Sequence, residues 1–202
     1  LAGFQVTTTG RFWVTAEAVP PNFSHFLDDP RPTHLANTKR SVIAAADLSQ
    51  AGLAVLPYLA AIMERDYARW EEFLLEHPEV EIVAEEFGTG LARADRGRAV
   101  LDRIKLMKAR LGRPLHLVAI SGAQFVEDIA ARFEHFTVID SNPFFKAIRR
   151  QMARLTPAGF AWEPTPADDV GALLYHNIAM YSRHIESLRR RSPVRLPIHP
   201  VL

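Results

Sequence analysis

Three carboxylates stand where apolar segments of the chain end, and carboxylates in that position could do acid–base chemistry. Glu85 and Glu86 close one apolar segment, and Asp140 closes another. A carboxylate at the end of a buried strand must be solvated, paired or functional. Asp140 together with Glu85 or Glu86 could transfer protons, or could hold a hard cation such as Mg²⁺ through oxygen ligands. The structural alternative is an ion pair between Asp140 and Lys146 or Arg149.

Small and polar residues follow the same strand ends and are candidates for binding a substrate. The glycines could let backbone N–H groups approach a phosphate, with the start of the next helix adding its positive end, or they could only allow a tight turn. Ser121 and Asn142 also suit the caps of the helices that follow them. The candidate substrate-binding residues are Tyr58, Gly88, Thr89, Gly90, Ser121, Gly122, Ser141 and Asn142.

Charge is unevenly distributed along the chain although the net charge is only +1. Acids dominate residues 64–86, and bases dominate residues 93–113. Such asymmetry indicates either an anionic partner for the basic part or two solvated helix faces of opposite sign. Basic helices can grip phosphates without sequence specificity, and the candidate nucleic-acid contacts are Arg103, Lys105, Lys146, Arg149, Arg150 and Arg190.

Several kinds of site find no support in the sequence. The chain has no cysteine, which excludes disulfides, thiolate metal sites and cysteine nucleophiles within these residues. The histidines form neither HxH nor HExxH, and GxSxG, Walker A and GxGxxG elements do not occur. His116, inside an apolar segment, is typical of a satisfied core histidine.

The bulk composition is that of an ordinary globular domain. The chain has 202 residues, of which 48% are hydrophobic and 23% charged. No apolar run reaches the roughly 18 residues that span a bilayer, so we expect no membrane segment, and the lack of cysteine favours a cytoplasmic location. Because the sequence begins with Leu1 and not Met, we expect a fragment, a processed form or an ordered subset of a longer chain.

The elements that must position the candidate residues are repeated strand–helix units. Each of four apolar segments is followed by one helical pattern, and the segments are residues 52–60, 80–87, 115–121 and 136–140. This alternation predicts an α/β fold with a parallel sheet covered by helices. We expect a (β/α)-barrel-like arrangement, complete or incomplete, with an open doubly wound sheet as the alternative. In either fold the strand ends share one edge, where the candidate residues would meet.

The predicted organisation has three parts, which we expect to form one domain. Residues 1–40 hold N-terminal strands and a long loop, residues 41–155 the βα-repeat core, and residues 156–202 a linker, a long helix and a basic proline-rich tail. Finer predictions are a hairpin or two edge strands over 3–19, a loop over 20–40, and helices over 41–52, from Asn142 (as N-cap) to Leu155, and over 168–190.

Three functions are consistent with these patterns. The first is an enzyme that acts on a phosphorylated or nucleotide-like substrate at the carboxyl ends of the strands by carboxylate acid–base or metal-assisted chemistry. The second is a non-catalytic nucleic-acid-associated protein that uses the basic helices. The third is a subunit that depends on a protein partner or on a second copy of itself.

Overall fold

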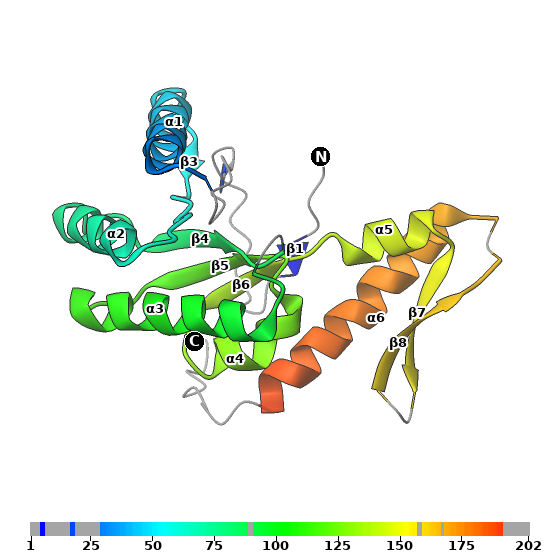
Figure 1. Cartoon of the computed structure of the whole chain (residues 1–202). Helices are drawn as coiled ribbons and strands as arrows, with labels where there is room; N and C mark the ends of the chain where they lie inside the picture. Colours follow the sequence, from blue (N-terminus) through cyan, green and yellow to red (C-terminus); the bar gives the residue numbers. More distant parts are fainter. Residues whose placement is uncertain are drawn as a thin grey trace, which may run out of the picture.

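Three parallel strands form the centre of the fold (Figure 1). The computed structural model describes residues 5–6, 17–18, 29–88, 91–156, 159–166 and 168–191. Strands β4 (Ile82–Glu86), β5 (His116–Ile120) and β6 (Phe136–Ile139) pair in that order. Tyr58 adds a parallel bridge to Ala84 beyond β4. The short strand β1 (Gln5–Val6) closes the other side, antiparallel to β6.

The helices that connect the parallel strands pack against one face of this sheet. They are α2 (Glu64–Glu76), α3 (Ala94–Leu111), the 3₁₀ turn η1 (Ala123–Phe125) and α4 (Val126–Ala130). Strand order follows chain order, and right-handed crossovers then place successive helices on the same side. The main core therefore lies between sheet and helices and includes Val83, Leu117 and Val138 from the strands and Leu74, Ile104 and Ile129 from the helices.

The opposite face of the sheet carries a smaller apolar cluster. Its buried members are Leu56, Tyr58, Ala84 and Val118. Sequential strands with helices on one side are the arrangement of a barrel segment and differ from a doubly wound sheet, which has helices on both faces. The α/β class is confirmed, but the sheet of the described residues is open at both sides, so the structure supports no closed barrel.

The C-terminal part corrects two predictions. Helix α5 (Asn142–Ile148) does not continue to Leu155, and the predicted linker is instead a hairpin of β7 (Gln151–Thr156) and β8 (Gly159–Pro164). The backbone of Arg150 has φ 54°, a left-handed conformation that ends the helix. The last helix, α6 (Val170–Arg191), agrees with its prediction and lies beside the hairpin (Figure 1).

Asn177, a buried amide on α6, is one of the side chains that attach the hairpin to this helix, and Nε2 of the neighbouring His176 also lies 3.0 Å from the carbonyl oxygen of Ala153. Asn177 is 0% exposed. Its Oδ1 accepts the backbone N–H of Ala153 at 2.8 Å, and its Nδ2 donates to the carbonyl of Gln151 at 2.9 Å. Both groups would otherwise be buried without partners, which is costly. These hydrogen bonds, together with the pairing of β7 with β8, hold residues 151–156 as a strand.

The N-terminal part corrects a third prediction. Helix α1 (Arg31–Gln50) begins ten residues before the predicted start, inside the expected loop. Its prolines lie at the helix start, where the absence of an N–H costs nothing. Of the two segments expected as a hairpin or two edge strands, β1 pairs with β6 and β2 (Glu17–Ala18) pairs with β3 (Ala54–Val55). They are therefore two separate strands.

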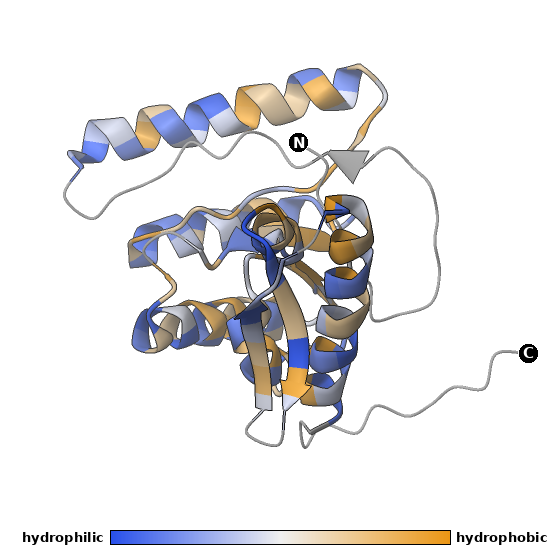
Figure 2. Cartoon of the chain, turned by 90° about the vertical axis from the view of Figure 1, so that its right-hand side faces the viewer, coloured by the Kyte–Doolittle hydropathy of each residue, from blue (hydrophilic) through white to orange (hydrophobic). Residues whose placement is uncertain are grey.

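Helix α1 stands apart from the sheet and its covering helices. In Figure 2 it crosses the top of the molecule and carries both hydrophilic and hydrophobic turns. Its N-terminal end is fixed by an ion pair from Arg31 to Asp66 of α2, 2.6 Å long. None of the helices in the described ranges is both long enough and apolar enough to cross a bilayer.

Candidate functional site

The carboxyl ends of β4, β5 and β6 meet at one edge of the sheet, which we call the strand-end rim. Glu86 is paired with Ile120, and Ile120 with Ile139, so the three strands end level with one another. Adjacent strands are about 4.8 Å apart, which separates Glu86 from Asp140 by roughly 10 Å. The predicted carboxylates thus lie at the same strand-end rim, but β5 lies between them.

Asp140 is held by two hydrogen bonds that connect the sheet to α6. Its Oδ1 accepts the backbone N–H of Asn142 at 2.8 Å, and its Oδ2 accepts the hydroxyl of Tyr181 at 2.9 Å. Burial, followed by the nearby Asp140 charge, raises the pKa of Tyr181. Neither Lys146 nor Arg149 makes the ion pair with Asp140 that was considered as an alternative.

The start of α5 differs from the predicted cap. Ser141 occupies the N-cap position without a side-chain cap hydrogen bond, and Asn142 is the first helical residue. Asp140 takes the capping role because its carboxylate reaches the N–H of Asn142. The side chain of Asn142 is in turn hydrogen-bonded to Tyr181. The Asp–Ser–Asn sequence therefore begins the helix and fixes α6 at the same point.

Glu85 is an acidic side chain that is buried inside the protein. It points to the helix-covered face and is only 3% exposed. Its Oε1 accepts the backbone N–H of Glu86 at 3.1 Å, while its buried Oε2 has no hydrogen-bond partner in the described part of the chain. Burial raises the pKa of Glu85 to about 8, against the lowering effect of hydrogen bonds from the Glu86 backbone and the Tyr58 side chain. Burial therefore favours the protonated form of this carboxyl group.

Two tyrosines flank this buried acid. Burial, and then the charge of Glu85, raises the pKa values of both Tyr58 and Tyr67. The side chain of Tyr58 is hydrogen-bonded to Glu85 and also contacts the backbone of Glu86. Tyr58 therefore links the inner acid to the outer edge of the sheet, where Glu86 lies half-buried.

Gly88 and Ser121 lie beside Glu86 at the strand-end rim. A methyl group added to Gly88 would lie 3.2 Å from Oε1 of Glu86 and 3.3 Å from Cβ of Ser121. Ser121 has φ 55°, which strains a non-glycine residue. Gly122 is required by packing, since a Cβ there would lie 2.7 Å from Cβ of Ala119. Thr89 and Gly90, also predicted here, lie outside the described residues.

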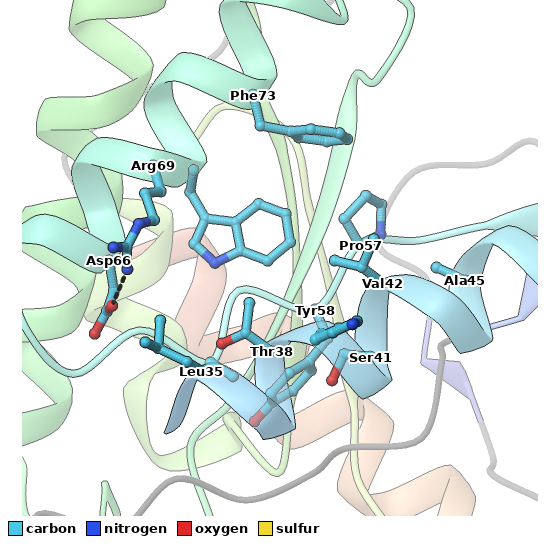
Figure 3. Close-up of a pocket in the computed structure, with 13 residues that line it drawn as sticks. Leu35, Thr38, Ser41, Val42, Ala45, Pro57, Tyr58, Asp66, Arg69 and Phe73 are labelled. Atoms are coloured by element: carbon cyan, nitrogen blue, oxygen red, sulfur yellow. Dashed lines mark ion pairs between the residues drawn. The ribbon is translucent and has the colours of Figure 1, made fainter. Parts of the chain in front are cut away.

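A pocket of about 360 Å³ lies between α1, α2 and residues 57–60, and we call it the lateral pocket (Figure 3). Tyr58 belongs to its wall, so the pocket and the buried acid share one side chain. Ala60, at the end of the first apolar segment, also lines it and has φ 32°. The other lining residues include Leu35, Lys39, Val42, Pro57, Asp66, Arg69, Trp70 and Phe73.

The opposite charges of the two blocks are partly matched inside the molecule. The acidic block forms α2 and the basic block α3, and Arg110 pairs with Glu71 at 3.0 Å. Arg103 pairs with Glu64 between the same helices. The uneven distribution of charge along the sequence therefore does not by itself require an anionic partner.

The remaining predicted basic residues are on α3, α5 and α6. Lys105 is exposed on α3. Lys146 lies 5.8 Å from the centre of the Trp162 ring, and Arg190 pairs with Glu186 at 3.0 Å. Arg149 and Arg150 are exposed at the end of α5.

Histidines and acids do not gather into a metal site in the described ranges, where no three such side chains form a group that could hold an ion. His116 faces the smaller apolar cluster, and its Nε2 lies 2.9 Å from Oγ1 of Thr137. Burial lowers the pKa of His116. This is the core environment that its position in an apolar segment predicts.

Comparisons of the chain with models of protein families, with curated proteins and with solved structures give no significant match.

Sequence reasoning missed Tyr67 and Tyr181. Both belong to helical apolar patterns, so the sequence predicts them only as core residues. The pattern does not show which acid each hydroxyl will contact. Tyr181 is 41 positions from Asp140. Pairing of that kind follows from tertiary structure alone.

Proposed function

We propose that this protein is an enzyme that acts on a phosphorylated or nucleotide-like compound at the strand-end rim by carboxylate acid–base chemistry. The observation that carries the proposal is Glu85, a buried carboxyl group that, among the described residues, has no cation paired with it and one oxygen without a hydrogen-bond partner. Such a group lowers stability, and pKa values shifted this far are concentrated at functional sites. A folded protein without a use for the group would gain from an apolar residue in its place.

Tyr58 gives the buried acid a route to the substrate. Its side chain is hydrogen-bonded to Glu85 and reaches the wall of the lateral pocket. When the hydroxyl of Tyr58 donates its proton to a substrate oxygen, Glu85 replaces that proton, and Tyr58 does not accumulate negative charge. The reverse transfer restores the acid. Glu86, Ser121 and the backbone at Gly88 contribute polar groups on the open side of the rim.

Calorimetry with a nucleoside monophosphate tests this proposal without knowledge of the reaction. Binding near the pKa of Glu85 should change the protonation of that residue, so the measured heat should depend on the ionisation enthalpy of the buffer at about pH 8. The Glu85→Gln variant should bind with a heat that is the same in all buffers. Failure of all four common nucleoside monophosphates to bind, or equal proton linkage in the variant, would contradict the proposal.

A second candidate function, binding of single-stranded nucleic acid, is favoured by one surface. Phe144, Phe145 and Ile148 are exposed on α5 beside Arg149 and Arg150. Exposed aromatic rings next to cations are the groups on which bases stack and phosphates bind. A labelled oligonucleotide should then bind with an affinity that falls as salt rises and that Phe145→Ala weakens. Absence of binding at about 50 mM salt would exclude this function.

A further inference from the structure

The lateral pocket is bounded by a helix that does not pack fully on its neighbours. On α1, Leu35 and Val42 line the pocket yet are 44% and 52% exposed. On α2, Trp70 and Phe73 line the facing side with ring centroids 5.6 Å apart, edge to face. Apolar surfaces of two helices thus face a shared space that no described residue fills.

The hydroxyl groups that α1 contributes to this wall, those of Thr38 and Ser41, do not make it polar. Oγ1 of Thr38 donates to the carbonyl of His34 at 2.9 Å, and Oγ of Ser41 donates to the carbonyl of Asn37 at 3.1 Å. Both donors are therefore used within α1. A ligand that lies against this wall needs an apolar body and few hydrogen-bonding groups.

The charges at the pocket favour a negative group on the ligand. Lys39 and Arg69 line it together with one acid, Asp66. Asp66 is already engaged, because its carboxylate pairs with Arg31 at 2.6 Å and accepts the backbone N–H of Met63 at 3.0 Å. The side chain of Arg69 is 54% exposed and lies 3.5 Å from Asp66, so it can reach a ligand at the mouth of the pocket.

We propose that the lateral pocket binds an aromatic compound with a single anionic group, its ring against Trp70 and Phe73 and its anion between Arg69 and Lys39. The volume of about 360 Å³ lies at the lower end of the range for small-molecule sites. The inference deepens the proposed function and rests on it, since Tyr58 joins the pocket to Glu85. It assigns the substrate an apolar ring system as well as an anion.

Calorimetry with 1-naphthyl phosphate, 1-naphthol and inorganic phosphate separates the two parts of the ligand. The naphthyl phosphate should bind most tightly, naphthol at least tenfold more weakly, and inorganic phosphate without saturation. Equal affinity for naphthol and naphthyl phosphate would overturn the assigned anion. Absence of naphthyl phosphate binding would overturn the pocket itself.

Two variants with matched controls locate the binding. Ala45→Trp should fill the pocket and abolish binding, whereas Ala46→Trp, one position along α1 and exposed, should leave it unchanged. Arg69→Gln should weaken naphthyl phosphate about tenfold without changing naphthol, since only a charge-assisted contact is lost. Arg65→Gln, on the same helix outside the pocket wall, should change neither. Binding that survives Ala45→Trp would place the ligand elsewhere and contradict the inference.

Failure of the pocket inference can be distinguished from failure of the proposed function. If naphthyl phosphate does not bind but nucleoside monophosphates bind with proton linkage to Glu85, the pocket inference fails and the proposed function stands. If naphthyl phosphate binds in the pocket and no proton linkage to Glu85 is found with any ligand, the acid–base function fails instead.

Discussion

The hydroxyl of Tyr181 donates to Oδ2 of Asp140 across a distance of 2.9 Å in the buried interior. This hydrogen bond connects the end of β6 to the middle of α6. The last helix is therefore fixed to the strand-end rim by a polar contact as well as by apolar packing. Through Asn177, the same helix also holds the β7–β8 hairpin.

Removal of the Tyr181 hydroxyl should destabilise the protein. In Tyr181→Phe the buried carboxylate of Asp140 loses one partner, which should lower the free energy of unfolding by about 1 to 3 kcal/mol. Urea denaturation followed by circular dichroism measures this change. Tyr175→Phe is the matched control, because Tyr175 lies on the same helix and is 76% exposed. Equal stability of the two variants would show that the contact contributes nothing.

The amide of Asn177 should determine whether the hairpin stays in place. Asn177→Leu keeps a side chain of similar volume but leaves the N–H of Ala153 and the carbonyl of Gln151 without partners. We expect faster hydrogen exchange at Ala153, with little change at residues of β4 and β5. Unaltered protection of the Ala153 amide would mean that the hydrogen bonds of Asn177 are not needed to hold β7 in place.

The protein should be more stable with glycine than with serine at position 121. The φ of 55° at Ser121 strains a residue with a Cβ, so Ser121→Gly should raise the free energy of unfolding by about 1 kcal/mol. Because Ser121 lies beside Glu86 and Gly88, the proposed function predicts weaker nucleotide binding in the same variant. Lower stability in thermal unfolding would argue against backbone strain at this turn.

The buried acid should make the stability of the protein depend on pH in an unusual direction. The pKa of Glu85 is raised from 4.5 to about 8 in the folded state, so the folded protein holds one more proton than the unfolded chain between these values. The free energy of unfolding should therefore fall as pH rises through that window, by roughly 1.4 kcal/mol per pH unit from this residue. Denaturation of wild type and Glu85→Gln at matched pH values isolates the effect. Glu79→Gln, which replaces an exposed acid, serves as the control. If the free energy of unfolding depends on pH identically in wild type and in Glu85→Gln, Glu85 does not hold a buried proton.

The sequence predicted the βα core well because apolar periodicity and helix-ending residues agree there. Residues 80–87, 115–121 and 136–140 each contain a strand of the parallel sheet, and Gly112 ends α3 in the left-handed conformation that glycine favours. Local patterns determine such elements, so a single sequence is enough to find them.

The failed predictions involve elements that depend on distant partners. The pattern of Met152 and Leu155 suits a helix, but Asn177, far along the chain, hydrogen-bonds to a strand there. Proline and asparagine around residues 30–37 suggested a loop, yet these residues belong to α1, whose first residue, Arg31, pairs with the distant Asp66. The candidate acids could be found from strand ends, whereas their burial and their tyrosine partners could not, since both arise from packing.

The titration of Glu85 is the most direct test of the claim that burial raises the pKa of this residue. In protein labelled with ¹³C-glutamate, the side-chain carboxyl resonance that disappears in Glu85→Gln can be followed as the pH is raised. We expect this resonance to titrate with a midpoint near pH 8. A midpoint near 4.5, the ordinary value for glutamate, would contradict that claim.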